Sequence, residues 1–268
     1  MSTEVRVQAR PSTAGFPAAI TRANHIEPVP RRIRAVLADE VVFDTTHAWY
    51  VWEWPYYPQY YIPLADVRSG ALTGENHTKA TRRGPVELHT VSVGETSRPG
   101  AAQVLRESEL PELKDTVRFD WAALDAWFEE DEQVFVHPRS PYVRVDALRS
   151  RRPLQIALEG QILADASTCV MVFETGLPSR YYVDPTAVNF EHLIASDTIT
   201  ACPYKGVTSG YWSVHTDSGV HPDLAWTYHF PTGAMLPIAG LVAFYNEKVD
   251  IRLDGVLLER PETHFFNH

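Results

Sequence analysis

The segment CPYKGVTSGYWSV, residues 202–214, holds the side chains of this chain that are best suited to chemistry. Cys202 and Lys205 are three residues apart, and a nearby ammonium group favours the thiolate form that acts as a nucleophile. Pro203 fixes φ and Gly206 can adopt a positive φ, so the same spacing also predicts a tight turn. From the spacing alone, a turn with a small half-buried cysteine is favoured over a nucleophilic or redox cysteine.

A carboxylate and several aromatic residues could complete a site around this segment. Glu174 ends the apolar run CVMVFE, where a carboxylate can act as an acid or base or anchor a turn. Tyr181 and Tyr182 alternate faces on a strand, so one should pack inward while the other can line a pocket. Aromatic rings with a few polar groups are typical of small-molecule pockets, although each ring fits an ordinary core equally well. The predicted ligand-binding residues are Glu174, Tyr182, Cys202, Lys205, Trp212, Trp226 and Tyr245.

The leading hypothesis is a small-molecule-binding protein whose pocket lies in the second half of the chain. In it Lys205 meets an anion or carbonyl, Glu174 meets a donor, and the aromatic rings contact the body of the ligand. The alternative is an enzyme with Cys202 as nucleophile or Glu174 as general acid or base, and a third hypothesis is a scaffold for another protein. The motifs GxGxxG, GxxxxGK[ST], HExxH and GxSxG are absent from the sequence, so we expect no cofactor.

Composition narrows the class of protein. The chain has 268 residues, 44% of them hydrophobic, and a formal net charge of −10. An acidic chain without a basic cluster repels phosphate backbones, so nucleic acid is not expected as a partner. Two cysteines are too few for a disulfide scaffold or a Cys-rich zinc site, so no metal is expected. No apolar run has the length of a signal sequence core or a membrane span, which predicts a soluble, cytoplasmic protein.

The chain is internally duplicated. A shift of 121 positions aligns residues 32–80 with 153–201 and pairs identical residues, among them Glu53 with Glu174 and Tyr61 with Tyr182. A second block aligns at a shift of 117, including Ala126 with Ala243. Because the matches keep their order across two blocks, duplication is favoured over chance, and two copies fit tandem domains better than a solenoid.

Each repeat is predicted to be mostly antiparallel β with one helix. In the second repeat, Ile238, Leu241, Val242 and Tyr245 have the spacing of an amphipathic helix that begins near Pro237. Trp121, Leu124 and Phe128 form the matching stripe in the first. We predict an N-terminal extension over 1–30, a first repeat over 31–136, a linker over 137–152 and a second repeat over 153–265.

Three blocks of the second repeat, FETGLPSRYYV, SDTITACPYKGVTSGYWSV and IAGLVAFYNEKVDI, resemble domain-of-unknown-function family 427. VWEWPYYPQYYIP and FDWAALDAWFEEDEQV resemble a divergent first copy, so the resemblance covers about residues 30–265. It implies two tandem β-tent-like domains, each with two small antiparallel sheets meeting at an angle and a helix alongside. Many β-tent proteins hold zinc with two CxxC pairs, which this chain lacks. The family has also been labelled a nucleotidyltransferase domain, yet the chain has neither a paired-Asp metal motif nor a glycine-rich phosphate loop.

The two copies differ at the segment CPYKGVTSGYWSV, residues 202–214. The first repeat has TRRG, residues 81–84, where the second has CPYKG, and Thr81 aligns with Cys202. No tryptophan lies opposite Trp212, whereas Glu53 and Tyr61 are kept. If the cysteine, lysine and tryptophan carry the function, the second repeat is the working copy. The first is then a structural partner or a modified pocket.

Overall fold

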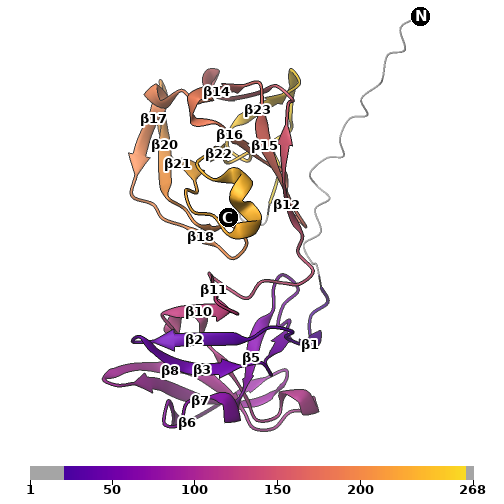
Figure 1. The fold of residues 1–268 in the computed structure, drawn as a ribbon, viewed down its shortest axis with the longest axis vertical. Helices are drawn as coiled ribbons and strands as arrows, with labels where there is room; N and C mark the ends of the chain where they lie inside the picture. Colours follow the sequence, from indigo (N-terminus) through magenta and orange to yellow (C-terminus); the bar gives the residue numbers. More distant parts are fainter. Residues whose placement is uncertain (1–20, 264–268) are drawn as a thin grey trace, which may run out of the picture. The chain divides into compact units, whose positions relative to one another are not determined.

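The computed structural model describes residues 21–263, which divide into two compact units (Figure 1). The first unit comprises residues 21–142 together with 201–206, and the second comprises 143–200 and 207–263. The segment 201–206 is therefore grouped with the first unit, although it belongs to the second repeat by sequence. Within the first unit, the Tyr204 hydroxyl accepts a hydrogen bond from the backbone N–H of Ser140 at 2.9 Å.

The first unit is built from two antiparallel sheets. The larger has the order β1-β4-β5-β9-β8-β7-β6, and the smaller has the order β11-β10-β2-β3. Their strands are β1 Ile26–Pro28, β2 Ile33–Leu37, β3 Glu40–Thr45, β4 Trp49–Val51, β5 Gln59–Pro63, β6 Leu72–Thr81, β7 Gly84–Val93, β8 Thr96–Leu105, β9 Thr116–Phe119, β10 Ala126–Glu129 and β11 Glu132–Val134. The short 3₁₀ helices are η1 Leu64–Asp66, η2 Pro111–Leu113 and η3 Trp121–Ala123.

The second unit repeats this topology strand for strand. Its larger sheet has the order β12-β15-β16-β22-β21-β20-β17, and its smaller sheet has the order β14-β13-β23-β24. Their strands are β12 Val145–Ser150, β13 Leu154–Leu158, β14 Gln161–Ala166, β15 Cys169–Glu174, β16 Arg180–Val183, β17 Leu193–Ser196, β20 Gly210–Thr216, β21 Gly219–Thr227, β22 Val242–Phe244, β23 Asp250–Leu253 and β24 Val256–Leu257. The 3₁₀ helices are η4 Pro185–Ala187, η5 Phe190–His192 and η6 Gly233–Ile238, and β18 Ala201–Cys202 pairs with β19 Gly206–Val207.

Strand alternation explains where the cores lie. In β13, Leu154, Ile156 and Leu158 are buried while the residues between them are half-exposed, as expected for a strand that packs one face inward. They belong to a core that also takes Met171, Tyr181, Val183 and Phe244 from the larger sheet. The intervening residues of the larger sheet form a separate cluster with Met235 and Ile238 of η6. Thus both faces of this sheet are covered.

Two predictions of helices are wrong. Val242–Phe244 is a strand in the second unit and Ala126–Glu129 is a strand in the first, each preceded by a 3₁₀ helix. Ile238, Leu241, Val242 and Tyr245 have helical spacing because a 3₁₀ turn and a strand buried on both faces each contribute apolar residues. Gly240, with φ of 73°, lies between the two elements and breaks the helical path.

The first block of the duplication is confirmed and the second block is wrong. β5 and β16 occupy equivalent places, and Ile62 pairs with Val117 as Val183 pairs with Val242. Continued along both strands, this register makes Phe119 the counterpart of Phe244. Ala126 lies in β10 and Ala243 in β22, which are not equivalent strands. The shift of 117 therefore matched residues by chance.

The ends of the predicted segments differ from the structure in detail. Residues 145–150 of the predicted linker form β12, an edge strand of the second unit, and Ile26–Pro28 of the predicted extension form β1. Residues 1–20 lie outside the described part of the chain. Across residues 21–263, no helix has the length and apolar content that crossing a membrane requires.

Candidate functional site

Three of the predicted site residues, Tyr182, Trp226 and Tyr245, come together on one face of the larger sheet of the second unit. Tyr182 is fully buried in β16, and its hydroxyl accepts a hydrogen bond from the Trp226 indole at 3.3 Å. The Trp226 ring lies 4.4 Å from the Tyr245 ring, measured between centroids. Trp226 is on β21 and Tyr245 directly follows β22, so three neighbouring strands position the cluster.

Tyr211 joins this cluster, although the sequence did not single it out. Its ring stacks against Trp226 at 6.2 Å, and its hydroxyl lies 2.8 Å from the Tyr245 hydroxyl and 3.2 Å from that of Thr200. Burial and then the hydrogen bond with Tyr211 raise the pKa of Tyr245 well above its ordinary value. The Tyr245 phenol is therefore protonated at neutral pH, and either hydroxyl of the pair can act as the donor.

Arg180 places a cation beside the rings. Its guanidinium lies 5.6 Å from the centre of the Tyr245 ring and 6.0 Å from that of Trp226. It is held by Glu247, whose two carboxylate oxygens accept from Nη1 at 2.6 Å and from Nη2 at 2.7 Å. Asn246 accepts from Nη1 at 3.2 Å. This bidentate geometry fixes the plane of the guanidinium. We call Tyr182, Tyr211, Trp226, Tyr245 and Arg180 the aromatic cluster.

The structure does not bring Trp212 into the aromatic cluster. Trp212 follows Tyr211 in β20, so the two side chains point to opposite faces of the sheet. Trp212 packs against the core between the two sheets and contacts the Phe190 ring at 5.7 Å. Glu174 is half-buried at the end of β15, and its backbone carbonyl accepts from the N–H of Leu177.

Cys202 and Lys205 lie in the segment 201–206, which belongs to the other unit, and so they form a separate group. The Lys205 ammonium donates to the Cys202 thiol, with Nζ and Sγ 3.9 Å apart. β18 and β19 flank the segment and Gly206 has a φ of 100°. The predicted turn is therefore confirmed, and it carries the two side chains close to each other.

A comparison of the sequence with profiles of known protein families finds one family, which matches both halves of the chain. The profile of a domain of unknown function, DUF427, matches residues 25–130 and again residues 146–255. The chain belongs to the DUF427 family. The predicted two tandem copies are confirmed by these matches. No curated protein sequence matches the chain.

The two DUF427 copies share their strands but not their site residues. The register pairs Tyr211 with Trp226 in the second copy and Leu88 with Gln103 at the same place in the first. The first copy thus lacks both rings there. Glu53 and Tyr61 are kept, and the Tyr61 hydroxyl donates to the Glu53 carboxylate at 2.8 Å. The Thr81 hydroxyl donates to the carbonyl of Gly84 at 2.7 Å and so closes the hairpin turn where the second copy has Cys202.

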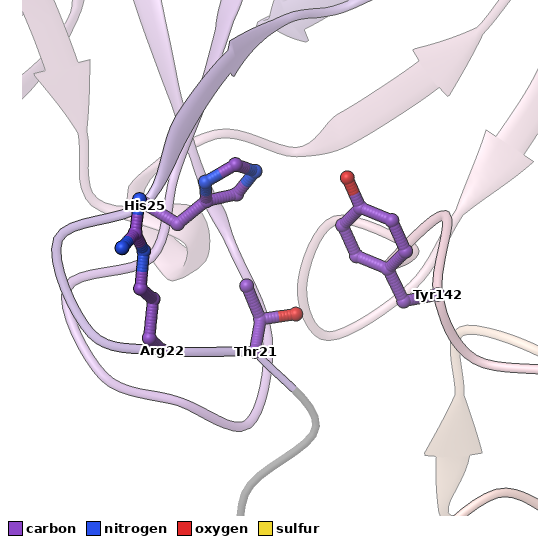
Figure 2. A pocket seen from close by; sticks show the side chains of 4 residues that line it. All are labelled: Thr21, Arg22, His25 and Tyr142. Atoms are coloured by element: carbon purple, nitrogen blue, oxygen red, sulfur yellow. The ribbon is translucent and has the colours of Figure 1, made fainter.

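The first unit carries an open pocket of about 420 Å³, lined by Thr21, Arg22, His25 and Tyr142 (Figure 2). Figure 2 shows the Tyr142 ring across the opening from Thr21 and His25. The His25 imidazole lies 2.8 Å from Glu27, which also accepts from the Tyr142 hydroxyl. Of the four lining residues, His25 and Tyr142 are therefore already hydrogen-bonded to Glu27. Within residues 21–263, no three His, Cys, Asp or Glu side chains gather as a metal site would require.

Proposed function

We propose that the second DUF427 copy binds a small molecule at the aromatic cluster. The observation that carries this proposal is the convergence of three packed aromatic rings, two linked phenol hydroxyls and one fixed guanidinium on one sheet face. Pockets for small molecules combine mostly apolar and aromatic walls with a few fixed polar groups. The buried ion pair of Arg180 is by itself weak evidence for a structural role, because the cost of removing two charges from water can exceed their attraction.

The chemistry of the cluster favours a flat ligand with a hydrogen-bond acceptor. Tyr245 is half-buried, so its ring can stack on an added planar group while Trp226 supports it from the other side. The Tyr211 and Tyr245 hydroxyls are hydrogen-bonded to each other, and an acceptor on a ligand could replace one of them as the partner of the other. A small aromatic or planar compound that bears a carbonyl or carboxylate group meets both requirements.

Binding of such compounds is expected to depend on Tyr245 and not on Trp212. A set of small aromatic carbonyl and carboxylate compounds can be screened by ligand-observed NMR. Tyr245→Ala should weaken each wild-type binder about tenfold or more, the size of an interface hot spot. Trp212→Ala should bind like the wild type, because Trp212 faces the other core. Unchanged binding by Tyr245→Ala, or no binder of the wild type, would contradict the proposal.

Glu174, Cys202 and Lys205 remain predicted contributors to the ligand site. Glu174→Gln and Lys205→Ala can enter the same screen; because Lys205 is buried, an unfolding curve of Lys205→Ala must first show that this variant is folded. A loss of affinity in Lys205→Ala would support the predicted contact of Lys205 with an anion or carbonyl. Unchanged affinity in both variants would limit the site to the aromatic cluster.

One observation favours the enzymatic alternative, the 3.9 Å between Lys205 Nζ and Cys202 Sγ. If Cys202 is a nucleophile, its rate of alkylation by iodoacetamide should rise with pH at a midpoint below the ordinary cysteine value of about 8.5. Lys205→Met should move that midpoint upward. The measurement needs Cys169→Ser as background, although burial already raises the pKa of the Cys169 thiol. If the alkylation midpoint of Cys202 has the ordinary value and does not change in Lys205→Met, Cys202 is not an activated nucleophile.

A further inference from the structure

We propose that the first unit holds an anion site of its own, formed by Arg83 and Arg118 beside Glu53 and Tyr61, for the phosphate or carboxylate group of a small molecule. This site lies in the copy that has lost the rings of the aromatic cluster. It is independent of the ligand site proposed for the second unit. Four separate elements supply its side chains: the end of β4, β5, the turn between β6 and β7, and β9.

The four side chains form one connected network. The Tyr61 hydroxyl donates to Glu53 Oε1 at 2.8 Å and accepts from Arg83 Nε at 3.0 Å. Arg83 Nη2 lies 3.1 Å from the same Glu53 oxygen, and Arg118 Nε lies 3.5 Å from it. Burial and then the charge of Glu53 raise the pKa of Tyr61, so Tyr61 stays neutral at physiological pH. The network therefore contains two cations and one anion.

The surplus positive charge has no other partner in the described part of the chain. Among residues 21–263, Glu53 is the only acidic residue within ion-pair distance of Arg83 or Arg118. Arg118 Nε is buried and makes no hydrogen bond there, because its contact with Glu53 is too long or poorly aligned. A buried N–H without an acceptor is unfavourable, because the hydrogen bond that it made to water in the unfolded chain is not replaced. Guanidinium groups match oxyanions through paired N–H donors.

The network is both accessible and preorganised. The side chains of Arg83, Arg118 and Glu53 are 11%, 22% and 20% exposed, so a small anion can reach them without unfolding the unit. The Arg83 guanidinium also lies 5.9 Å from the centre of the Tyr61 ring, which restricts its movement. Ordered donors lose less conformational entropy on binding than free surface arginines do.

The comparison of the two copies shows that one of the two cations, Arg118, is specific to the first copy. Arg118 pairs with Gln103 in β8, and at the same place in the second copy Ala243 pairs with Trp226. Arg83 precedes Gly84 in the turn as Lys205 precedes Gly206. The first copy has thus exchanged an alanine and a tryptophan for an arginine and a glutamine. That exchange suits a small polar anion and not a stacked ring.

Calorimetric titration of the full chain with inorganic phosphate, and separately with acetate, at constant ionic strength tests this proposal. We expect saturable binding of at least one of the two anions. Arg118→Ala, which installs the residue of the second copy, should weaken it about tenfold, the value of one charged hydrogen bond. Arg106→Ala is the matched control, since Arg106 is 52% exposed and pairs only with exposed carboxylates. It should change affinity less than twofold.

A second readout needs no variant. In the wild type, the ¹⁵Nε–H signals of Arg83 and Arg118 should shift with added phosphate or acetate along one saturation curve, while that of Arg106 should not. Equal affinity in Arg118→Ala and Arg106→Ala, or Nε signals that do not move, would overturn the proposal. If Arg118→Ala fails to fold, the ¹⁵Nε–H signals of the wild type alone test the anion site.

Discussion

Replacing Glu247 with alanine is expected to lower the free energy of unfolding of the second unit by about 3–5 kcal/mol, the cost of breaking a buried ion pair. The Glu247 side chain is only 4% exposed, and both of its oxygens bond to Arg180. Without this carboxylate, a guanidinium that is 16% exposed keeps Asn246 as its remaining hydrogen-bond acceptor among the side chains of residues 21–263. Arg180 would then no longer be fixed beside Tyr245, so ligand binding at the aromatic cluster should fall as well.

Urea unfolding followed by tryptophan fluorescence measures this loss. Asp250→Ala serves as the control because it removes an exposed pair with Arg260, in which both side chains are more than 40% exposed. Exposed pairs contribute about 0–1 kcal/mol. If Glu247→Ala costs no more than Asp250→Ala, the Arg180–Glu247 pair does not hold the cluster in place.

Replacing Glu129 with alanine is expected to destabilise the first unit by a similar amount, about 3–5 kcal/mol. Its side chain is 2% exposed and forms ion pairs with Arg31 and, at 3.1 Å, with Arg139. It also accepts a hydrogen bond from the buried Tyr60 hydroxyl at 2.6 Å. Alanine would leave two guanidinium groups and one phenol without their shared acceptor.

Glu132→Ala is the matched control for Glu129, because Glu132 contacts the same Arg139 but is 72% exposed. It should cost less than about 1 kcal/mol. A second measurement uses Tyr50, whose pKa is raised to about 12 by burial and then by the charge of Glu129. Glu129→Gln removes that charge, so the pKa of Tyr50 should fall in a spectrophotometric titration. An unchanged Tyr50 titration together with a small stability loss would contradict this account of Glu129.

Strands and duplication could be predicted from the sequence because they depend on local alternation. The runs on the two sides of Glu159 predict a pair of strands, and the structure has β13 and β14 there. The runs around Met171 and Tyr182 each lie in one strand, β15 and β16. The predicted helices failed because spacing of three and four residues also arises where a 3₁₀ turn meets a strand buried on both faces. Val242 and Tyr245 satisfy the helical pattern only for that reason.

The candidate site was only partly predictable. Tyr182, Trp226 and Tyr245 are aromatic residues of one repeat, and the sheet brings them together. Only the register of β20 shows that Trp212 lies outside the aromatic cluster, since a shift of one residue reverses the face to which a side chain points. Arg180 and Glu247 are 67 positions apart, and no local pattern in one sequence reveals that they are paired and buried.

The most direct test of ligand binding by the second unit is the indole N–H signal of Trp226 during titration with the best compound from the screen. The chain has seven tryptophans, and Trp226→Phe and Trp212→Phe assign the two signals that matter. We predict that the Trp226 signal shifts to saturation with the ligand while the Trp212 signal stays in place. A ligand that moves Trp212 and leaves Trp226 unchanged would show that the aromatic cluster is not the binding site.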